Sequence, residues 1–198
     1  MNRRNVLTAL GGLAISGGAL FGSGAFTSTE AKRELEVNVV NETDIADQYV
    51  DVVLEDVGSH TELGVDKTSD SDGTDDPANL FPDSNNSYGN SGYSPDDTDV
   101  SLIENDVKVI FGTSGNELPP NTQVDYDGLF TVVNDGDTTT DDFSVTMSTE
   151  RGDLLTDQSD NNDITSGTVS SGTTTSLDAR LNTGNNSKET DTLTITIS

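Results

Sequence analysis

The sequence contains no cysteine and no tryptophan, and only one of its 198 residues is histidine. Without cysteine the chain can form neither a disulfide framework nor a thiolate metal site. The single histidine, His60, lies in a turn-like stretch with no nucleophile motif beside it, so a histidine-based triad is not indicated. No phosphate-binding glycine–lysine loop and no zinc-binding histidine pair occurs. The sequence therefore predicts a protein that is not an enzyme.

Basic residues are also scarce, with 9 Lys and Arg against 36 Asp and Glu and a formal charge of −27. Arg3 and Arg4 are the only charged residues among the first 25, so removing them leaves 7 basic residues against 36 acidic ones and a charge of −29. Such a charge repels nucleic acid and anionic membranes. In molar salt, where the Debye length is only about 3 Å, the repulsion is screened. The composition is typical of a protein from an extreme halophile.

Long hydrophobic runs are missing except near the start of the chain. Arg3 and Arg4 precede a glycine-rich apolar run over residues 9–21, and small residues follow at Ser23 and Ala25. This order is that of a cleavable export signal, and the arginine pair with a weakly apolar centre favours the twin-arginine route. We expect cleavage after Ala25.

Two alternatives to a cleaved signal fit the apolar run less well. Six glycines dilute residues 11–24, whereas a membrane-spanning anchor needs about 20 apolar residues. A pilin-like signal keeps its apolar segment as a helix, and glycine is a poor helix former. The expected mature protein is a single extracellular domain over residues 26–198, with no membrane-spanning segment.

After residue 26, apolar residues recur at every second position, which is the pattern of half-buried strands. No segment shows a convincing helical period, and the regular alternation argues against an acidic disordered chain. With about eight strands joined by turn-rich loops, we expect an all-β protein, an antiparallel β-sandwich of jelly-roll type. The expected strands are carried by Leu35, Val37 and Val39; Val50, Val52 and Leu54; Val107, Val109 and Phe111; Val124, Tyr126, Gly128, Phe130 and Val132; Phe143, Val145 and Met147; residues 165–170; Leu177, Ala179 and Leu181; and Leu193, Ile195 and Ile197.

Residues 67–99 break the alternation. They are rich in Ser, Asp, Asn and Gly, with Pro77, Pro82 and Pro95 as further turn signals. They contain too few apolar residues to form a core of their own. We expect a long acidic loop whose removal leaves thermal stability in molar salt nearly unchanged.

Aspartates at alternate positions of this loop are the best candidate for a cation site. Calcium prefers several hard oxygen ligands, and a glycine-permitted turn can bring them together. The later glutamate of an EF-hand is missing, so a solvated acidic loop is the alternative interpretation. The candidate calcium ligands are Asp70, Asp72, Asp75 and Asp76, and a weaker second set is Asp157, Asp160 and Asp163.

Three Asn-x-Ser/Thr sequons are candidate sites of N-glycosylation. They begin at Asn41, Asn85 and Asn185. In a chain so rich in Asn and Thr some sequons arise by chance, but for an archaeal surface protein we expect at least one to be occupied.

Two segments resemble the exported TasA/camelysin group of fibre subunits. Residues 24–30, Gly-Ala-Phe-Thr-Ser-Thr-Glu, are similar to the end of that group's signal, where a small and an aromatic residue precede a start rich in Ser, Thr and acids. Residues 117–122, running into residues 128–136, are similar to its segment of leucine, proline, polar turn, strand and Asn-x-Gly. The chain is also similar to haloarchaeal exported proteins that share this start.

This resemblance implies a jelly-roll subunit of an extracellular fibre, joined to its neighbours by donated N-terminal strands. The donor-strand residues that it implies are Phe26, Leu35, Val37 and Val39. The chain departs from the group in its twin-arginine signal and its acidic insertion. The signal matters because the twin-arginine route exports folded proteins, whereas a donor-strand subunit lacks one strand until it polymerises.

The sequence thus predicts a secreted structural protein that self-associates into a filament, pilus or biofilm matrix. A second interpretation stays open, namely a monomeric cell-surface module whose acidic loop binds cations or glycans. Two readings are also open for the first strand, which is either donated to a neighbour or kept as the first strand of a closed domain. No nucleic-acid partner is expected, and calcium is the only cofactor that the sequence suggests.

Overall fold

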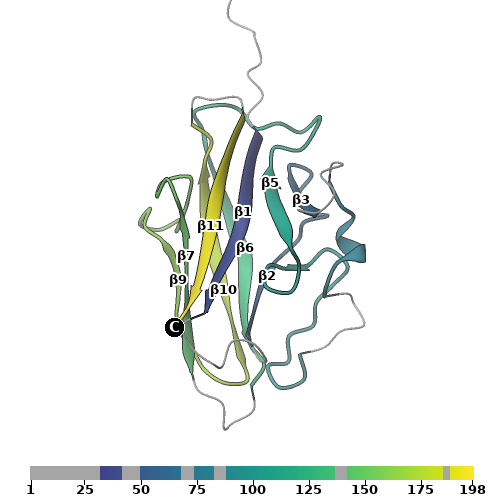
Figure 1. Ribbon diagram of the computed structural model, residues 1–198, viewed down its shortest axis with the longest axis vertical. Coiled ribbons are helices and arrows are strands. Elements are labelled where there is room, and N and C mark those ends of the chain that lie inside the picture. Colours follow the sequence, from purple (N-terminus) through teal and green to yellow (C-terminus); the bar gives the residue numbers. More distant parts are fainter. Residues whose placement is uncertain (1–31, 42–49, 68–73, 83–87, 137–141, 185–187) are drawn as a thin grey trace, which may run out of the picture.

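The computed structural model describes residues 32–41, 50–67, 74–82, 88–136, 142–184 and 188–198. Their strands form two sheets stacked face to face, so the predicted β-sandwich is confirmed (Figure 1). A short 3-10 helix, η1 (Pro77–Asn79), lies between β3 and β4. The strands are β1 (Lys32–Asn41), β2 (Val50–Leu54), β3 (Leu63–Lys67), β4 (Val100–Ser101), β5 (Val107–Phe111), β6 (Gln123–Asn134), β7 (Phe143–Thr149), β8 (Leu155–Thr156), β9 (Ile164–Val169), β10 (Thr173–Asn182) and β11 (Lys188–Ile197).

One sheet has six strands in the order β3-β5-β1-β11-β7-β9, and the other has five in the order β4-β2-β6-β10-β8. The paired strands run antiparallel with one exception, since β1 and β11 run parallel along their full length. The prediction of an antiparallel sandwich is therefore wrong for this pair. These are the first and last strands, and a parallel pair needs only a long connection, which the rest of the domain supplies.

The core lies between the sheets and follows the predicted alternation. In β7, for example, Phe143, Val145 and Met147 are buried, while the residues between them are only partly buried. The inward side chains of β11, Leu193, Ile195 and Ile197, are at most 1% exposed. Burial of such side chains stabilises the domain by about 25 cal/mol per Å² of apolar surface, so the period-two pattern is also the main source of stability.

Three strands were not predicted. Two of them, β4 and β8, are only two residues long, which is too short for an alternation to be seen. The third, β3, has apolar side chains only at Leu63 and Val65. It forms because it pairs with β5 through five residues in register, a tertiary contact that the local sequence does not reveal.

The loop of residues 67–99 contributes to the core, contrary to expectation. Leu80 is 5% exposed and belongs to the same apolar cluster as the sheets. Its neighbour Phe81 is fixed through the backbone, because the Ser101 amide donates to the Phe81 carbonyl at 2.8 Å and the Phe81 amide donates to Asn105 Oδ1 at 3.2 Å. The expectation that the loop can be removed without loss of stability is therefore not supported.

Among the described residues there is no helix long and apolar enough to cross a membrane.

Candidate functional site

The predicted donor strand β1 lies inside its own sheet, between β11 and β5. It pairs with β11 in parallel over all ten residues, from Lys32 opposite Lys188 to Asn41 opposite Ile197. On its other side it pairs with β5 only over four residues, Arg33 to Glu36. We call residues 37–41 the open half of β1, because no described strand pairs with them on the β5 side.

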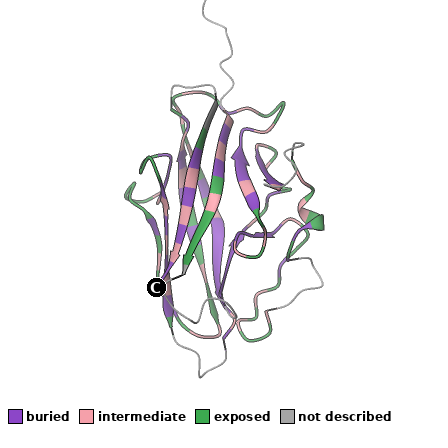
Figure 2. Cartoon of the chain, viewed as in Figure 1, coloured by how far each residue is buried: buried purple, intermediate pink, exposed green. Residues whose placement is uncertain are grey.

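Burial falls along β1 in step with this pairing. Leu35 is fully buried, Val37 is partly buried, and Val39 is 37% exposed. On β11, Ile195 lies directly opposite Val39 and is fully buried. Because no described strand lies beside Val39 on the β5 side, its exposure belongs to that side of β1 and not to the end of the sandwich. Figure 2 shows the exposed second half of β1 beside the largely buried strands around it.

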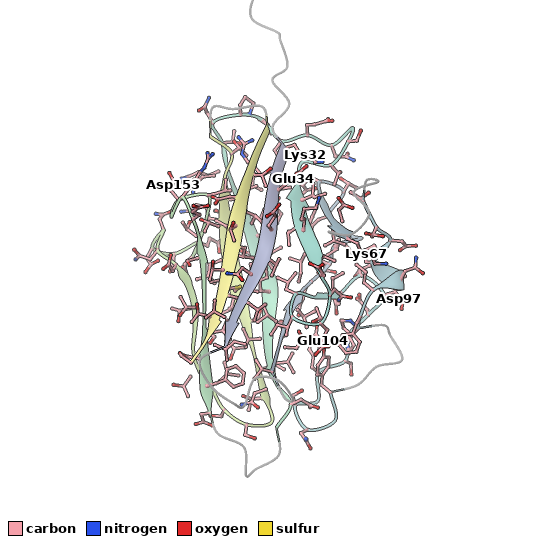
Figure 3. All side chains as sticks on the ribbon, viewed as in Figure 1. Lys32, Glu34, Lys67, Asp97, Glu104 and Asp153 are labelled. Carbon is pink, nitrogen blue, oxygen red and sulfur yellow. The ribbon has the colours of Figure 1, made fainter. Side chains whose placement is uncertain are left out.

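The outer face of the first half of β1 carries charged side chains. Lys32 Nζ lies 2.8 Å from Glu34 Oε1, and both are labelled at the start of the strand in Figure 3. Glu36 lies opposite Lys108 of β5, and Lys108 lies opposite Asp66 of β3. Lys108 Nζ is 3.1 Å from Asp66 Oδ2, and this hydrogen bond raises the pKa of Lys108, helped by the charges of Asp66 and the β1 glutamates. An alternating row of charges thus crosses three strands.

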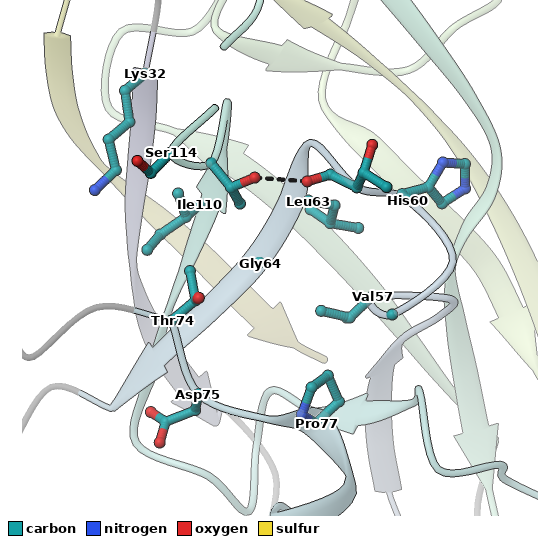
Figure 4. A pocket seen from close by; sticks show the side chains of 13 residues that line it. Lys32, Val57, His60, Leu63, Gly64, Thr74, Asp75, Pro77, Ile110 and Ser114 are labelled. Carbon is teal, nitrogen blue, oxygen red and sulfur yellow. Dashed lines mark hydrogen bonds between the residues drawn. The ribbon is translucent and has the colours of Figure 1, made fainter. Parts of the chain in front are cut away.

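A pocket of about 420 Å³ opens on the outer face of β3 (Figure 4). Gly64 forms part of its lining, where an added Cβ would lie 2.9 Å from Thr74 Cγ2 and 3.0 Å from Thr113 Cγ2. An alanine at this position would therefore have to displace a threonine methyl group. The Thr113 hydroxyl donates to the carbonyl of Thr61 at 2.5 Å. The lining mixes apolar and hydroxyl side chains with those of Lys32, His60 and Asp75.

His60 of this pocket makes contacts that account for its position. Its Nδ1 lies 3.6 Å from Glu62 Oε1. Its ring meets that of Tyr126 edge to face at 5.6 Å. Among the described contacts, neither partner of His60 is a serine or threonine side chain.

The candidate calcium ligands are described only in part, because Asp70 and Asp72 lie outside the described residues. Asp75 accepts the Lys67 amide at 2.7 Å through Oδ2, and Asp76 caps η1 by accepting the Ala78 amide at 3.2 Å. Both carboxylates thus already bond to backbone amides. No group of three or more His, Cys, Asp or Glu side chains in the described part of the chain is arranged to hold a metal ion. The loop site stays a prediction.

The second candidate set forms local turns. The Ser159 amide donates to Asp157 Oδ1 at 2.7 Å, and the Asn162 amide donates to Asp160 Oδ1 at 3.0 Å. The bonds from Asn162 lower the pKa of Asp160. Asp163 is exposed and directly precedes β9.

The side chains of the remaining predicted site residues are not described. Asn41 ends β1, but its side chain is not described. The signal residues, the first donor residue and two sequons lie outside the described part of the chain; they are Arg3, Arg4, Ala25, Phe26, Asn85 and Asn185.

A cluster that sequence reasoning missed lies on the outer face of β2. Asp51 is 3% exposed and accepts a hydrogen bond from Ser101 Oγ at 2.5 Å and another from the Tyr88 hydroxyl. The Tyr93 hydroxyl lies 2.9 Å from Asp99 Oδ2 and 3.2 Å from an oxygen of Glu55. The rings of Tyr88 and Tyr93 meet edge to face at 5.5 Å. Two tyrosines from the acidic loop thus lie against three carboxyl groups at the edge of the sandwich. The only hint in the sequence was a pair of tyrosines in an otherwise polar loop.

Burial raises the pKa of Asp51 to about 6, although the hydrogen bonds from Ser101 and Tyr88 act in the opposite direction. Burial also raises the pKa values of Glu55 and Asp99. A carboxyl group with a raised native pKa favours the folded state most at low pH, and that contribution is lost as the pH rises to the native pKa. The cluster should therefore weaken the fold as the pH rises from about 4 to 6.

Replacing Asp51 by Asn should flatten this dependence, because the amide carries no charge: its oxygen can accept from one of the two hydroxyl groups, and its NH2 group can donate to the oxygen of the other. The raised pKa of Asp51 corresponds to a loss of about 3 kcal/mol in the free energy of unfolding between pH 4 and 7. We expect the variant's free energy of unfolding to fall by that much less over the same pH range. Urea unfolding in molar NaCl across this pH range measures the difference. The exposed Asp153→Asn serves as the control and should keep the slope of the unaltered protein. Equal slopes for Asp51→Asn and the unaltered protein would contradict the assignment.

Comparison of the chain with protein-family models, with curated proteins and with solved structures found no match in any of the three.

Proposed function

We propose that this chain is a non-enzymatic structural protein, exported by the twin-arginine route, that assembles outside the cell into a filament or matrix through donated N-terminal strands. The proposal includes a jelly-roll topology for the β-sandwich. The observation that carries it is the placement of β1, which combines full pairing with β11, short pairing with β5 and an exposed apolar half. A strand of this kind offers backbone donors and acceptors to a neighbour.

Composition supports the same proposal. The acidic surface suits a protein that works in molar salt, where apolar contacts between subunits are not opposed by long-range repulsion. A head-to-tail strand contact does not close on itself, so repeated use of it produces a fibre.

Electron microscopy of the secreted protein in molar NaCl tests the proposal, and we expect filaments. A variant whose mature chain begins at Glu34 should keep its β-sheet circular dichroism but form no filaments. A synthetic peptide of residues 26–40 should stop the growth of the unaltered protein, because it occupies the acceptor but has no folded domain from which the fibre could continue. Normal polymerisation of the shortened chain, or a protein that stays monomeric at every concentration, would refute donor-strand assembly.

A second candidate function is a monomeric surface module that binds a glycan or a cation. The pocket beside β3 favours it, because its volume and its mixed lining suit a small polar ligand. A concentration-independent monomer in the same experiment would support this function instead.

A further inference from the structure

The open half of β1 is an unoccupied stretch of sheet edge within the described part of the chain. β5 begins at Val107 and its pairing with β1 ends at Lys108 opposite Glu36. Beyond this point β1 continues for five residues, which stay paired with β11 on one side only. An edge of this kind presents a row of backbone amide and carbonyl groups that another extended chain can pair with.

The open half has an exposed apolar side chain on each face of the sheet. Val39 points to the inner face and is 37% exposed, while Val40 points to the outer face and is 39% exposed. They are two of the three large apolar side chains that are exposed in the described residues, the third being Phe81. A strand laid beside this edge would cover both valines.

The open half also carries no charge. Its sequence, Val-Asn-Val-Val-Asn, has no acidic residue, in a chain with 36 of them. Two copies of so acidic a protein repel each other least where neither presents a carboxylate. Residues 26–31, Phe-Thr-Ser-Thr-Glu-Ala, contain a single acidic residue and two β-branched threonines that favour an extended strand.

A chain's own residues 26–31 cannot lie beside its own open half. They join β1 at Lys32, at the end opposite to Asn41 and the C-terminus (Figure 1). At about 3.3 Å per residue, Val40 lies roughly 26 Å along the strand from Lys32. Six extended residues span only about 20 Å, and the β5 side of the intervening half is filled by β5. The segment can therefore lie beside Val39 and Val40 only on a second copy.

We propose that the open half of β1 is the acceptor for residues 26–31 of a second copy of this chain, which add to it as an extra strand. This inference rests on the proposed function and specifies its contact: β1 stays in its own sheet, and only the segment before it is donated. Phe26, the one large apolar side chain of the segment, covers the exposed valines. Because the donor leaves from one end of β1 and the acceptor lies at the other, the subunits line up head to tail along the strand direction.

Introduced cysteines test this contact, since the chain has none of its own. Val40→Cys is combined in turn with Thr27→Cys, Ser28→Cys and Thr29→Cys, so that no register is assumed. The secreted proteins are oxidised mildly in molar NaCl and run on a denaturing gel without reductant. We expect at least one combination to give a ladder of covalent oligomers, because these positions cannot meet within one chain. The same donor cysteines combined with Thr168→Cys, exposed on the edge strand β9, should give no ladder.

A second pair shows whether β1 stays in its own sheet. Asn38 and Thr194 lie directly opposite each other on β1 and β11, so Asn38→Cys with Thr194→Cys should give a bond within one chain and a single band of monomer size. A ladder from this pair would mean that β1 itself is exchanged, which overturns the proposal while leaving filament assembly intact. Filaments without any ladder at Val40 would overturn it in the same way. Absence of filaments from the unaltered protein would overturn both this inference and the proposed function.

Discussion

Replacing Leu80 by Ala should lower the free energy of unfolding by about 2–5 kcal/mol, the usual range for a buried leucine whose removal leaves a cavity. Leu80 follows η1 and is 5% exposed in the main apolar cluster. The effect is large relative to a total stability of about 5–15 kcal/mol for a typical domain. Urea unfolding in molar NaCl, monitored by circular dichroism, measures it.

The adjacent Phe81 provides a matched control. Its side chain is 37% exposed, and the hydrogen bonds that hold it involve its backbone, which Phe81→Ala keeps. Phe81→Ala should therefore lower the free energy of unfolding less than Leu80→Ala does, although phenylalanine is the larger residue. Deleting residues 68–98 should unfold the domain, because it removes Leu80 together with both tyrosines of the β2 cluster. A loop deletion that melts at the temperature of the intact protein would show that the core does not depend on this segment.

The strands that the sequence predicts well have one face against the core and one toward solvent. In β7 and β11 the alternation of apolar and polar residues matches the alternation of buried and less buried positions. Such a pattern depends only on the two-residue repeat of a strand, so it can be read without knowing the neighbours. β2 also follows the prediction at Val50, Val52 and Leu54, although all five of its residues are buried.

The sequence fails where burial depends on a partner that is distant along the chain. Asp51 and Val53 of β2 face outward, yet they are 3% and 0% exposed, partly because Tyr88 of the acidic loop, 37 positions from Asp51, bonds to this face. The parallel pairing of β1 with β11 joins the two ends of the domain. Neither contact leaves a local periodicity, so neither could be predicted.

The same distinction between local pattern and distant contact applies to the candidate assembly site. The sequence predicted that Leu35, Val37 and Val39 share one face of a strand. It did not predict that their burial falls from Leu35 to Val39. That fall arises because β5 pairs with β1 over only four residues. An edge is a property of the sheet and not of the strand, so the sequence alone could not locate it.

Lowering the NaCl concentration from molar to tens of millimolar should remove most of the free energy of unfolding of this domain. Residues 26–198 hold only 7 basic side chains against 36 acidic ones, so most carboxylates have no basic partner within the chain. At molar salt the Debye length is about 3 Å, and at 0.01 M it is about 30 Å, so unscreened repulsion then acts across the whole sandwich. Thermal melts over a series of NaCl concentrations should show a steep fall in melting temperature as the salt is lowered. KCl should have the same effect as NaCl at equal concentration.

A variant with fewer charges decides whether repulsion is the cause. Glu150, Asp153 and Asp163 are exposed, and neutralising them as Glu150→Gln, Asp153→Asn and Asp163→Asn leaves the described core and β1 untouched. If repulsion between carboxylates sets the salt requirement, this variant should unfold at a lower NaCl concentration than the unaltered protein. It should differ little from that protein in molar salt, where screening already removes most of the repulsion. The same salt midpoint for both proteins would mean that salt acts through the strength of apolar burial and not through charge.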